Sequence, residues 1–363
     1  MKIVVDMDPD TYEEIKSLVT AGSYESVEQF LRAAADNQLT IEASEGYRTD
    51  AVDSSDESPE DPAASSPSQS YLWGYDPASD PPVRDPHPVD RHELLLFSQF
   101  YRFLPLKFAL SELADITGDS DSPVKLDEFR DHVSEAVIPV RDALTSWEDA
   151  NDISKQNRLS TGFPKRDSSD PERTMRRYLN HYVGHYPTGS ESPSGFGHQL
   201  GLVSIQREPD SPPTIALTPA GAAFVALTNP VLADGPAEDR TSLSENERHY
   251  LVAHIRATLD LEYEFMNFVY RILENHEGTY TGALDHFRAF LEDCSQFTED
   301  PSENRVRSHT AGTISRMVAL GVLRRGSRRG VYETGTPLNS YRYPPQIRDR
   351  VPNTATATDT INK

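Results

Sequence analysis

The residues of this sequence best suited to binding chemistry are arginines near its carboxyl end. Between Ser302 and Gly330 the chain has seven arginines and a single acid, Glu303. A guanidinium group is planar and permanently charged, so it can donate two parallel hydrogen bonds to a phosphate or to the edge of a guanine. This composition predicts contacts with nucleic acid. The arginines concerned are Arg305, Arg307, Arg316, Arg324, Arg325, Arg328 and Arg329.

Helical spacing would place part of this set on one surface. Residues at i, i+4, i+7 and i+11 share a helix face, and those positions hold Arg305, His309, Gly312 and Arg316. Ile314, Met317 and Val318 would form the opposite, core-facing side. We therefore expect the side of this helix that carries Gly312 to approach DNA closely.

A turn follows the helix and carries the remaining arginines. Arg324, Arg325, Arg328 and Arg329 surround Gly326 and Gly330, where a phosphate or minor-groove contact would lie. The alternative for the whole stretch is that its arginines pair with the protein's own carboxylates, as surface networks do at high salt. A second basic group is either an auxiliary phosphate contact or a solvated surface. It consists of Lys165, Arg166, Arg173, Arg176 and Arg177.

Catalytic and metal chemistry have little support. His181 and His185 are four residues apart, a spacing that could place both imidazoles on one metal, but no matching carboxylate or cysteine set follows. Cys294 is the single cysteine, which excludes a disulfide framework and a cysteine-rich zinc site. The sequence has no Gly-x-Ser-x-Gly elbow and no Walker loop. We expect no catalytic residue, no metal and no cofactor.

The net charge opposes nucleic-acid binding in ordinary salt. The chain has 58 acids and 35 basic residues, a formal charge of -23, and only seven of the basic residues are lysines. Such acid-rich, lysine-poor chains are typical of a cytoplasm that holds molar salt, where the Debye length falls to ~3 Å and distant charges hardly interact. Under that screening, local charge decides what is bound. An ordinary acidic cytoplasmic protein is the alternative.

Neither a membrane segment nor a secretory signal is expected. No stretch reaches the ~20 apolar residues that a membrane-spanning helix needs. The amino terminus, MKIVVDMDPD, has no extended apolar run of the kind that secretory signals contain. The sequence therefore predicts a cytoplasmic protein.

Residues 1–42 predict one strand and two helices. Apolar residues alternate from Ile3 to Met7 as in a strand with one apolar face. A helix starts at Asp8, and Ser26 opens a second helix with a capping box. The simplest way to satisfy the open backbone groups of such a lone strand is to pair it with its twin in a second chain. This pattern resembles the ribbon-helix-helix family, which implies a homodimer whose two-stranded ribbon enters the major groove.

The charge of this module favours dimerisation over DNA reading. Residues 1–42 contain three basic residues and nine acids. The outward positions of the ribbon, which would read bases, are Lys2, Val4 and Asp6. Lys2 and the backbone N–H of Ser26, at the start of the second helix, are the candidate DNA contacts of the module.

Residues 43–92 predict a disordered acidic linker. They contain eight prolines, nine serines and eleven acids against three arginines, a composition that cannot bury enough apolar surface to fold. The aromatic run from Tyr71 to Tyr75 is the exception. It is either an anchor that packs back on the folded body or a motif for docking a partner.

Two further units, 93–235 and 242–336, each place helices before a hairpin. The order resembles winged-helix DNA-binding domains, and Leu217-Thr218-Pro219-Ala220-Gly221 resembles the exit that follows the wing in many winged-helix regulators. In the second unit, Ser244 and Glu247 form a capping box before a long apolar helix. The remaining residues, 337–363, predict a flexible tail.

The predicted fold class is mainly α with small β: a ribbon-helix-helix, an acidic linker and two winged-helix-like units. The predicted function is that of a homodimeric DNA-binding protein, a transcriptional regulator of a halophile, which contacts double-stranded DNA through its carboxy-terminal winged helix. The alternative is a protein-interaction adaptor or an antitoxin-like assembly protein, because winged helices also bind proteins and a fold does not fix a function.

Overall fold

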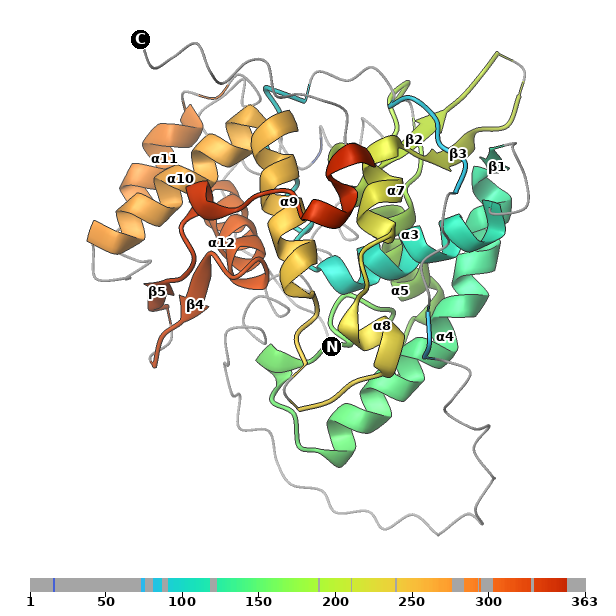
Figure 1. Ribbon diagram of the computed structural model, residues 1–363, viewed down its shortest axis with the longest axis horizontal. Helices are drawn as coiled ribbons and strands as arrows, with labels where there is room; N and C mark the ends of the chain where they lie inside the picture. Colours follow the sequence, from blue (N-terminus) through green and yellow to red (C-terminus); the bar gives the residue numbers. More distant parts are fainter. Residues whose placement is uncertain are drawn as a thin grey trace.

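The computed structural model describes residues 16, 73–75, 81–86, 91–117, 123–188, 190–209, 211–238, 240–275, 284–292, 294, 303–327 and 330–350. This part of the protein is mainly helical, with small antiparallel sheets (Figure 1). It contains no helix long and apolar enough to cross a membrane. The ribbon-helix-helix module predicted for residues 1–42 lies outside the described residues except for Lys16, so Lys2 and Ser26 are not placed.

The first half of the body places helices before and after a three-stranded antiparallel sheet of order β1-β3-β2. Asp170 caps α5, because its carboxylate accepts a hydrogen bond from the backbone N–H of Arg173. Pro105 lies in the first turn of α3, where a proline is tolerated because the N–H that it lacks would have no partner within the helix. The elements are α3 (Phe103–Thr117), β1 (Val124–Lys125), α4 (Leu126–Ala150), α5 (Pro171–Tyr178) with a π-helical continuation (Leu179–Val183), α6 (Phe196–Gln199), β2 (Val203–Gln206), β3 (Thr214–Leu217), α7 (Pro219–Val225) and α8 (Pro230–Asp234).

Within the described residues, the second half contains four α-helices and a hairpin, followed by two short 3₁₀ helices, Leu338–Ser340 and Pro345–Arg350. The predicted capping box is confirmed: the Ser244 hydroxyl accepts a hydrogen bond from the backbone N–H of Glu247, and the Glu247 carboxylate accepts one from the backbone N–H of Ser244. The elements are α9 (Glu245–Thr258), α10 (Asp260–Asn275), α11 (Leu284–Glu292), α12 (Glu303–Ala319), β4 (Leu323–Arg325) and β5 (Tyr332–Thr334).

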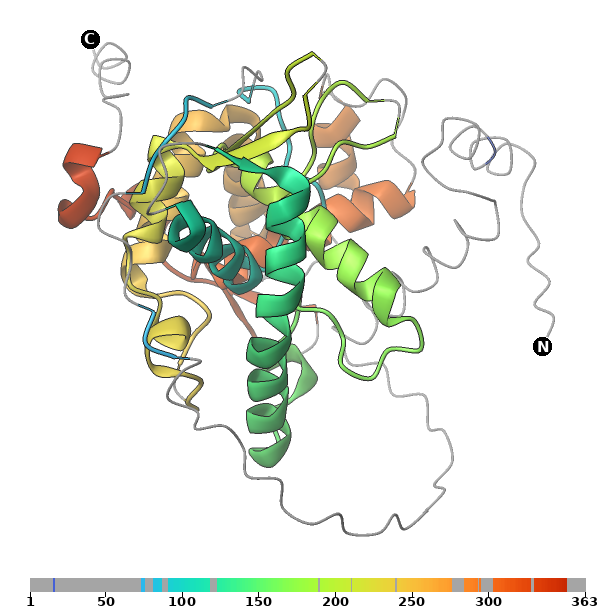
Figure 2. The same ribbon diagram turned by 90° about the vertical axis from the view of Figure 1, so that its right-hand side faces the viewer.

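Both halves share one hydrophobic core. Buried side chains from α3, α4 and the sheet form a single continuous cluster with those of α9, α10 and α12. In Figure 1, α10, α11, α12 and the β4–β5 hairpin lie at the left, and α4 and the three-stranded sheet lie at the right, with α3 and α9 between them. Figure 2 views the molecule from the side of α4 and shows α3 and α5 on either side of it.

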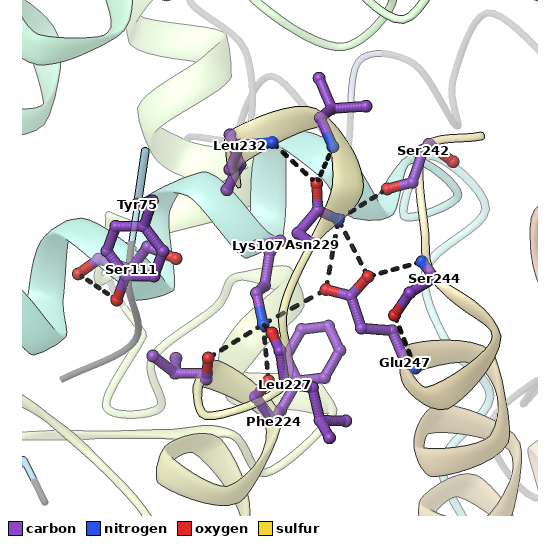
Figure 3. Close-up of polar contacts among 12 residues, drawn as sticks. Tyr75, Lys107, Ser111, Phe224, Leu227, Asn229, Leu232, Ser242, Ser244 and Glu247 are labelled. Carbon is purple, nitrogen blue, oxygen red and sulfur yellow. Dashed lines mark hydrogen bonds and ion pairs between the residues drawn. The ribbon is translucent and has the colours of Figure 1, made fainter. Parts of the chain in front are cut away.

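A buried ion pair joins the two halves (Figure 3). The Lys107 ammonium, on α3, lies 3.2 Å from a Glu247 oxygen on α9, and both side chains are 0% exposed. Lys107 also donates to the carbonyls of Phe224, Val225 and Leu227 at 2.6–3.2 Å, while Asn229 donates to both Glu247 oxygens. Every charge here has its partners, which is the condition for a buried pair to be tolerated. The cluster is therefore a structural tie between α3, α7 and α9.

The predicted linker is partly folded onto the body. Trp73 and Tyr75 pack against the hydrophobic core, and the backbone N–H of Tyr75 donates to the carbonyl of Leu232 at 3.3 Å. Of the two interpretations of the aromatic run, residues 73–75 support the anchor, because two large aromatic rings bury enough surface to hold them against the body.

Two other segments pack on the folded body although the sequence predicted that they would be disordered or flexible. Residues 81–86 contact the sheet, where the backbone N–H of Arg84 donates to the carbonyl of Leu217 at 2.8 Å. The expected flexible tail packs on the core as far as Ile347, since Leu338, Tyr341 and Ile347 are buried. Residues 351–363 lie outside the described part of the chain.

Candidate nucleic-acid interface

Arg316, a predicted DNA contact, is buried inside the protein. Its side chain is 0% exposed, and both Nε and Nη2 donate to the Oε1 atom of Glu262 on α10, at 3.0 and 2.8 Å. Its Nη1 atom donates to the carbonyls of Phe97 and Phe100. The expectation that Arg316 faces DNA is wrong, because this guanidinium is engaged by the protein's own carboxylate.

Gly312 and His309 lie on the same inner face of α12. A Cβ atom at Gly312 would lie 2.1 Å from the backbone oxygen of Ser98, so the bare helix surface admits the protein's own chain rather than DNA. His309 is 8% exposed, and burial, followed by the charges of Arg316 and Arg305, lowers its pKa to about 4. The predicted DNA-facing stripe is therefore incorrect at these positions also.

The open face of α12 is displaced from the predicted stripe by one residue. Asn304 is exposed, and Ser308, Ala311 and Ser315 are partly exposed. These four residues have the same spacing as the predicted stripe, i, i+4, i+7 and i+11. Because one residue corresponds to about 100° around a helix, the open face is rotated by about that angle from the predicted one. Arg305 and Arg307, both predicted contacts, are exposed near the start of the helix.

Two predicted contacts in the turn after α12 are exposed. Arg324 and Arg325 lie on β4, which pairs antiparallel with β5 so that Arg325 is opposite Tyr332. The backbone N–H of Gly326 donates to the carbonyl of Val331 at 2.9 Å, which extends the pairing towards the turn. Arg328 and Arg329 lie outside the described residues.

Arg324 and Arg325 also line a cleft of about 1020 Å³, which we call the basic cleft. Its walls come from the start of α3, the end of α4 and the loop after it, the residues before and within the first turn of α9, the end of α12, and β4. It is lined by six arginines and three acids, the reverse of the balance in the whole chain, where acids outnumber basic residues by 58 to 35. The charged residues are Arg102, Arg158, Arg240, Arg248, Arg324 and Arg325, with Asp152, Glu238 and Glu245.

The arginines of the basic cleft are only partly neutralised. The guanidinium of Arg325 is partly desolvated within the cleft although the residue is exposed overall, and this desolvation, followed by repulsion from the like charge of Arg102, lowers the pKa of Arg325. Within the described chain, Arg102, Arg248 and Arg324 form no ion pair with a carboxylate, whereas Arg158 pairs with Asp149 at 2.8 Å. A cluster of unneutralised guanidinium groups in a concave site attracts a polyanion.

The remaining candidates do not join this site. Arg173, Arg176 and Arg177 lie on α5 and do not line the basic cleft. Burial lowers the pKa of His181 to about 3, and Phe97, Phe100 and Tyr182 pack around its ring. Over the described ranges, no three histidine, cysteine or acidic side chains come together in a way that could hold a metal.

Sequence analysis missed four of the six arginines in the cleft. Arg102, Arg158, Arg240 and Arg248 come from the segments before α3, after α4, before α9 and within α9. Each is an isolated basic residue in the sequence, so no local pattern marks it. Comparison with known proteins adds no further evidence, since no protein family, no curated protein and no solved structure matches the chain.

Proposed function

We propose that this protein is a DNA-binding transcriptional regulator of a halophile, and that it contacts duplex DNA through the open face of α12 and the β4–β5 hairpin. The observation that carries the proposal is the charge of the basic cleft, at whose edge Arg324 and Arg325 are exposed. The module predicted for residues 1–42 would join two chains into a homodimer, which would raise avidity for a two-part site.

The order of elements supports a winged-helix reading of both halves. In the first half, helices precede a sheet in which β3 lies between β1 and β2. In the second half, α11 and α12 precede the β4–β5 hairpin. In winged-helix proteins the helix before the hairpin enters the major groove. In this chain that helix is α12.

The open face of α12 suits close contact with DNA. Ser308, Ala311 and Ser315 are small, so the helix axis can approach the bases, and Ser315 also lines the basic cleft. Arg307 lies on the exposed surface near the start of the helix, and Arg324 follows its end. Serine can bond to base edges, while arginine can grip phosphate or guanine.

The test replaces the two exposed arginines of β4. The double variant Arg324→Ser/Arg325→Ser should bind a labelled duplex more weakly than the wild type across a series of KCl concentrations in the molar range. Each phosphate contact makes the plot of log K against log salt steeper by about 1. Loss of two contacts should therefore reduce the magnitude of its negative slope by about 2. The measurement is fluorescence anisotropy with genomic duplexes selected by enrichment from native-salt extracts.

The matched control is Arg271→Ser/Arg348→Ser, which removes the same charge from exposed positions outside the cleft. It should leave both affinity and slope nearly unchanged. If the wild type binds no duplex, or if both double variants lose affinity equally, the proposal fails. Retained binding by the β4 variant would instead favour the adaptor alternative, in which the arginines contact protein.

A further inference from the structure

Trp147 is an aromatic side chain in the basic cleft whose position the core does not explain. The protein has two tryptophans. Trp73 packs against the hydrophobic core, whereas Trp147, at the end of α4, is partly exposed, lies outside that cluster and lines the cleft. An exposed indole costs free energy in water unless a partner covers it. Its place among arginines indicates the chemistry of that partner.

The chain around Trp147 is held rigidly. The neighbouring Glu148 is buried and accepts hydrogen bonds from the backbone N–H and the hydroxyl of Ser160, at 2.7 and 2.5 Å. These bonds fix the loop after α4 against the helix end. Arg158, on that loop, is held in turn by Asp149, which directly follows Glu148. The indole and the Arg158 guanidinium are therefore presented together by one preorganised segment.

Three arginines of the cleft have Nε donors for which the described residues offer no acceptor. The Nε atoms of Arg102, Arg158 and Arg248 are buried and have no hydrogen-bond partner in the part of the chain that the structure describes. A buried donor without an acceptor costs free energy. A phosphate in the cleft would offset this cost by pairing with the positive charge of these side chains, and it would also relieve the repulsion between Arg102 and Arg325.

We propose that the basic cleft binds a nucleoside phosphate, with the base stacked on Trp147 and the phosphate held by Arg102 and Arg158. Stacking on an aromatic ring combined with arginine contacts to phosphate is the chemistry by which proteins hold unpaired nucleotides. The ligand is either a free nucleotide or a nucleotide unit of a single strand. This inference rests on the same basic cleft as the proposed function, because Arg324 and Arg325 also line it. It differs in the contacts that it uses, since the duplex proposal involves neither Trp147 nor Arg158.

The test uses Trp147 as its own reporter. In the variant Trp73→Phe, Trp147 is the only tryptophan left, so fluorescence excited at the red edge of the absorption band reports on the cleft alone. The probes are an oligothymidylate, adenosine triphosphate, adenosine and inorganic phosphate, each titrated in molar KCl. Calorimetric titration of the wild type with the same probes provides a second measurement should Trp73→Phe fail to fold.

Saturable quenching is expected with the oligothymidylate or the triphosphate. Quenching by the oligothymidylate alone identifies a single strand as the source, and quenching by the triphosphate identifies a free nucleotide. Trp147→Ala should weaken binding by about tenfold or more, the loss expected for one stacked base. Arg102→Ser/Arg158→Ser should weaken it similarly, while Arg271→Ser/Arg348→Ser should have no effect.

Two results would overturn the inference. One is the absence of saturable quenching and of heat with every probe. The other is binding of inorganic phosphate as tight as that of the nucleotides, which would make the site a simple anion site without a role for Trp147. Because duplex affinity is measured separately by anisotropy, failure here leaves the duplex proposal standing, and the reverse also holds.

Discussion

A buried histidine on α9, His254, makes the stability of this protein depend on pH. His254 is buried on α9, its ring stacks on Tyr250 with centroids 5.7 Å apart, and its Nε2 atom lies 2.7 Å from the carbonyl oxygen of Leu200. Nε2 must carry the hydrogen that this carbonyl accepts, so protonation would have to occur at the other ring nitrogen. Burial is the main reason that the pKa of His254 is lowered, to about 4 from 6.5, with a smaller contribution from the charge of Arg91.

The first prediction follows from the sign of this shift. Since the folded state holds the neutral ring, its contribution is complete above about pH 6.5 and is lost as the pH falls towards 4. The loss at pH 4 should be about 2 to 3 kcal/mol for this residue. In His254→Gln, which can still donate to Leu200 but does not titrate, denaturant unfolding should show a shallower pH dependence. An unchanged slope would contradict the assigned pKa.

At the scale of elements, a local sequence pattern predicted where α9 begins, but no such pattern predicted which side of α12 faces inward. Local signals are sufficient for the capping box at Ser244 and for the start of α5 at Pro171, because cap and helix are neighbours in sequence. The buried side of α12 depends on Glu262, which is 54 residues away from Arg316. A stripe of arginine, histidine and glycine reads as a surface by composition, and only the tertiary partner shows that it is internal.

Gly312 provides the prediction at this scale. Alanine normally stabilises a helix by about 1 kcal/mol relative to glycine. In Gly312→Ala, however, the new methyl group would collide with the Ser98 backbone, 2.1 Å away, and overpacking of this kind costs about 1 to 3 kcal/mol. Denaturant unfolding should therefore show a loss of stability.

The control for Gly312→Ala is Ser308→Ala on the partly exposed face of the same helix. It should change the free energy of unfolding by less than about 0.5 kcal/mol. If Gly312→Ala proved as stable as the wild type, the close packing of α12 against residues 97–100 would be incorrect.

At the scale of the whole molecule, the sequence suggested two separate units, and the structure joins them. Lys107 pairs with Glu247 across the division, and Arg316 in the second unit donates to the carbonyl of Phe100 in the first. Internal repetition of helices and a hairpin can be read from the sequence. The shared core cannot, because it depends on which apolar faces meet.

The third prediction is a single cooperative unfolding transition. Arg316→Met leaves the Glu262 carboxylate buried without its partner, which should cost about 3 to 5 kcal/mol. Because the core is continuous, the fluorescence of Trp73 and Trp147, which both precede the second unit, and the circular dichroism of all helices should shift together. Two separate transitions would indicate that the halves fold independently.

The companion variant is Arg316→Met/Glu262→Gln. The side-chain amide introduced at position 262 can still accept the hydrogen bond that Glu262 receives from the backbone N–H of Leu96 at 3.0 Å. No buried charge is then left without a partner. It should recover part of the stability lost in Arg316→Met. Equal stability of the single and double variants would show that the uncompensated carboxylate is not the cause.

The position of Trp73 sets a practical limit on how far the chain can be trimmed for crystallisation. A Cβ atom at Gly235 would lie 3.0 Å from the indole of Trp73, and Gly74 and Tyr75 bond to Leu232. A shortened chain that starts at α3 would lack Trp73 and Tyr75, and so it would expose an apolar surface on α8, next to the loop that leads to α9. Trimmed versions should therefore keep everything from Trp73 onward, although that boundary lies within what composition alone marks as dispensable.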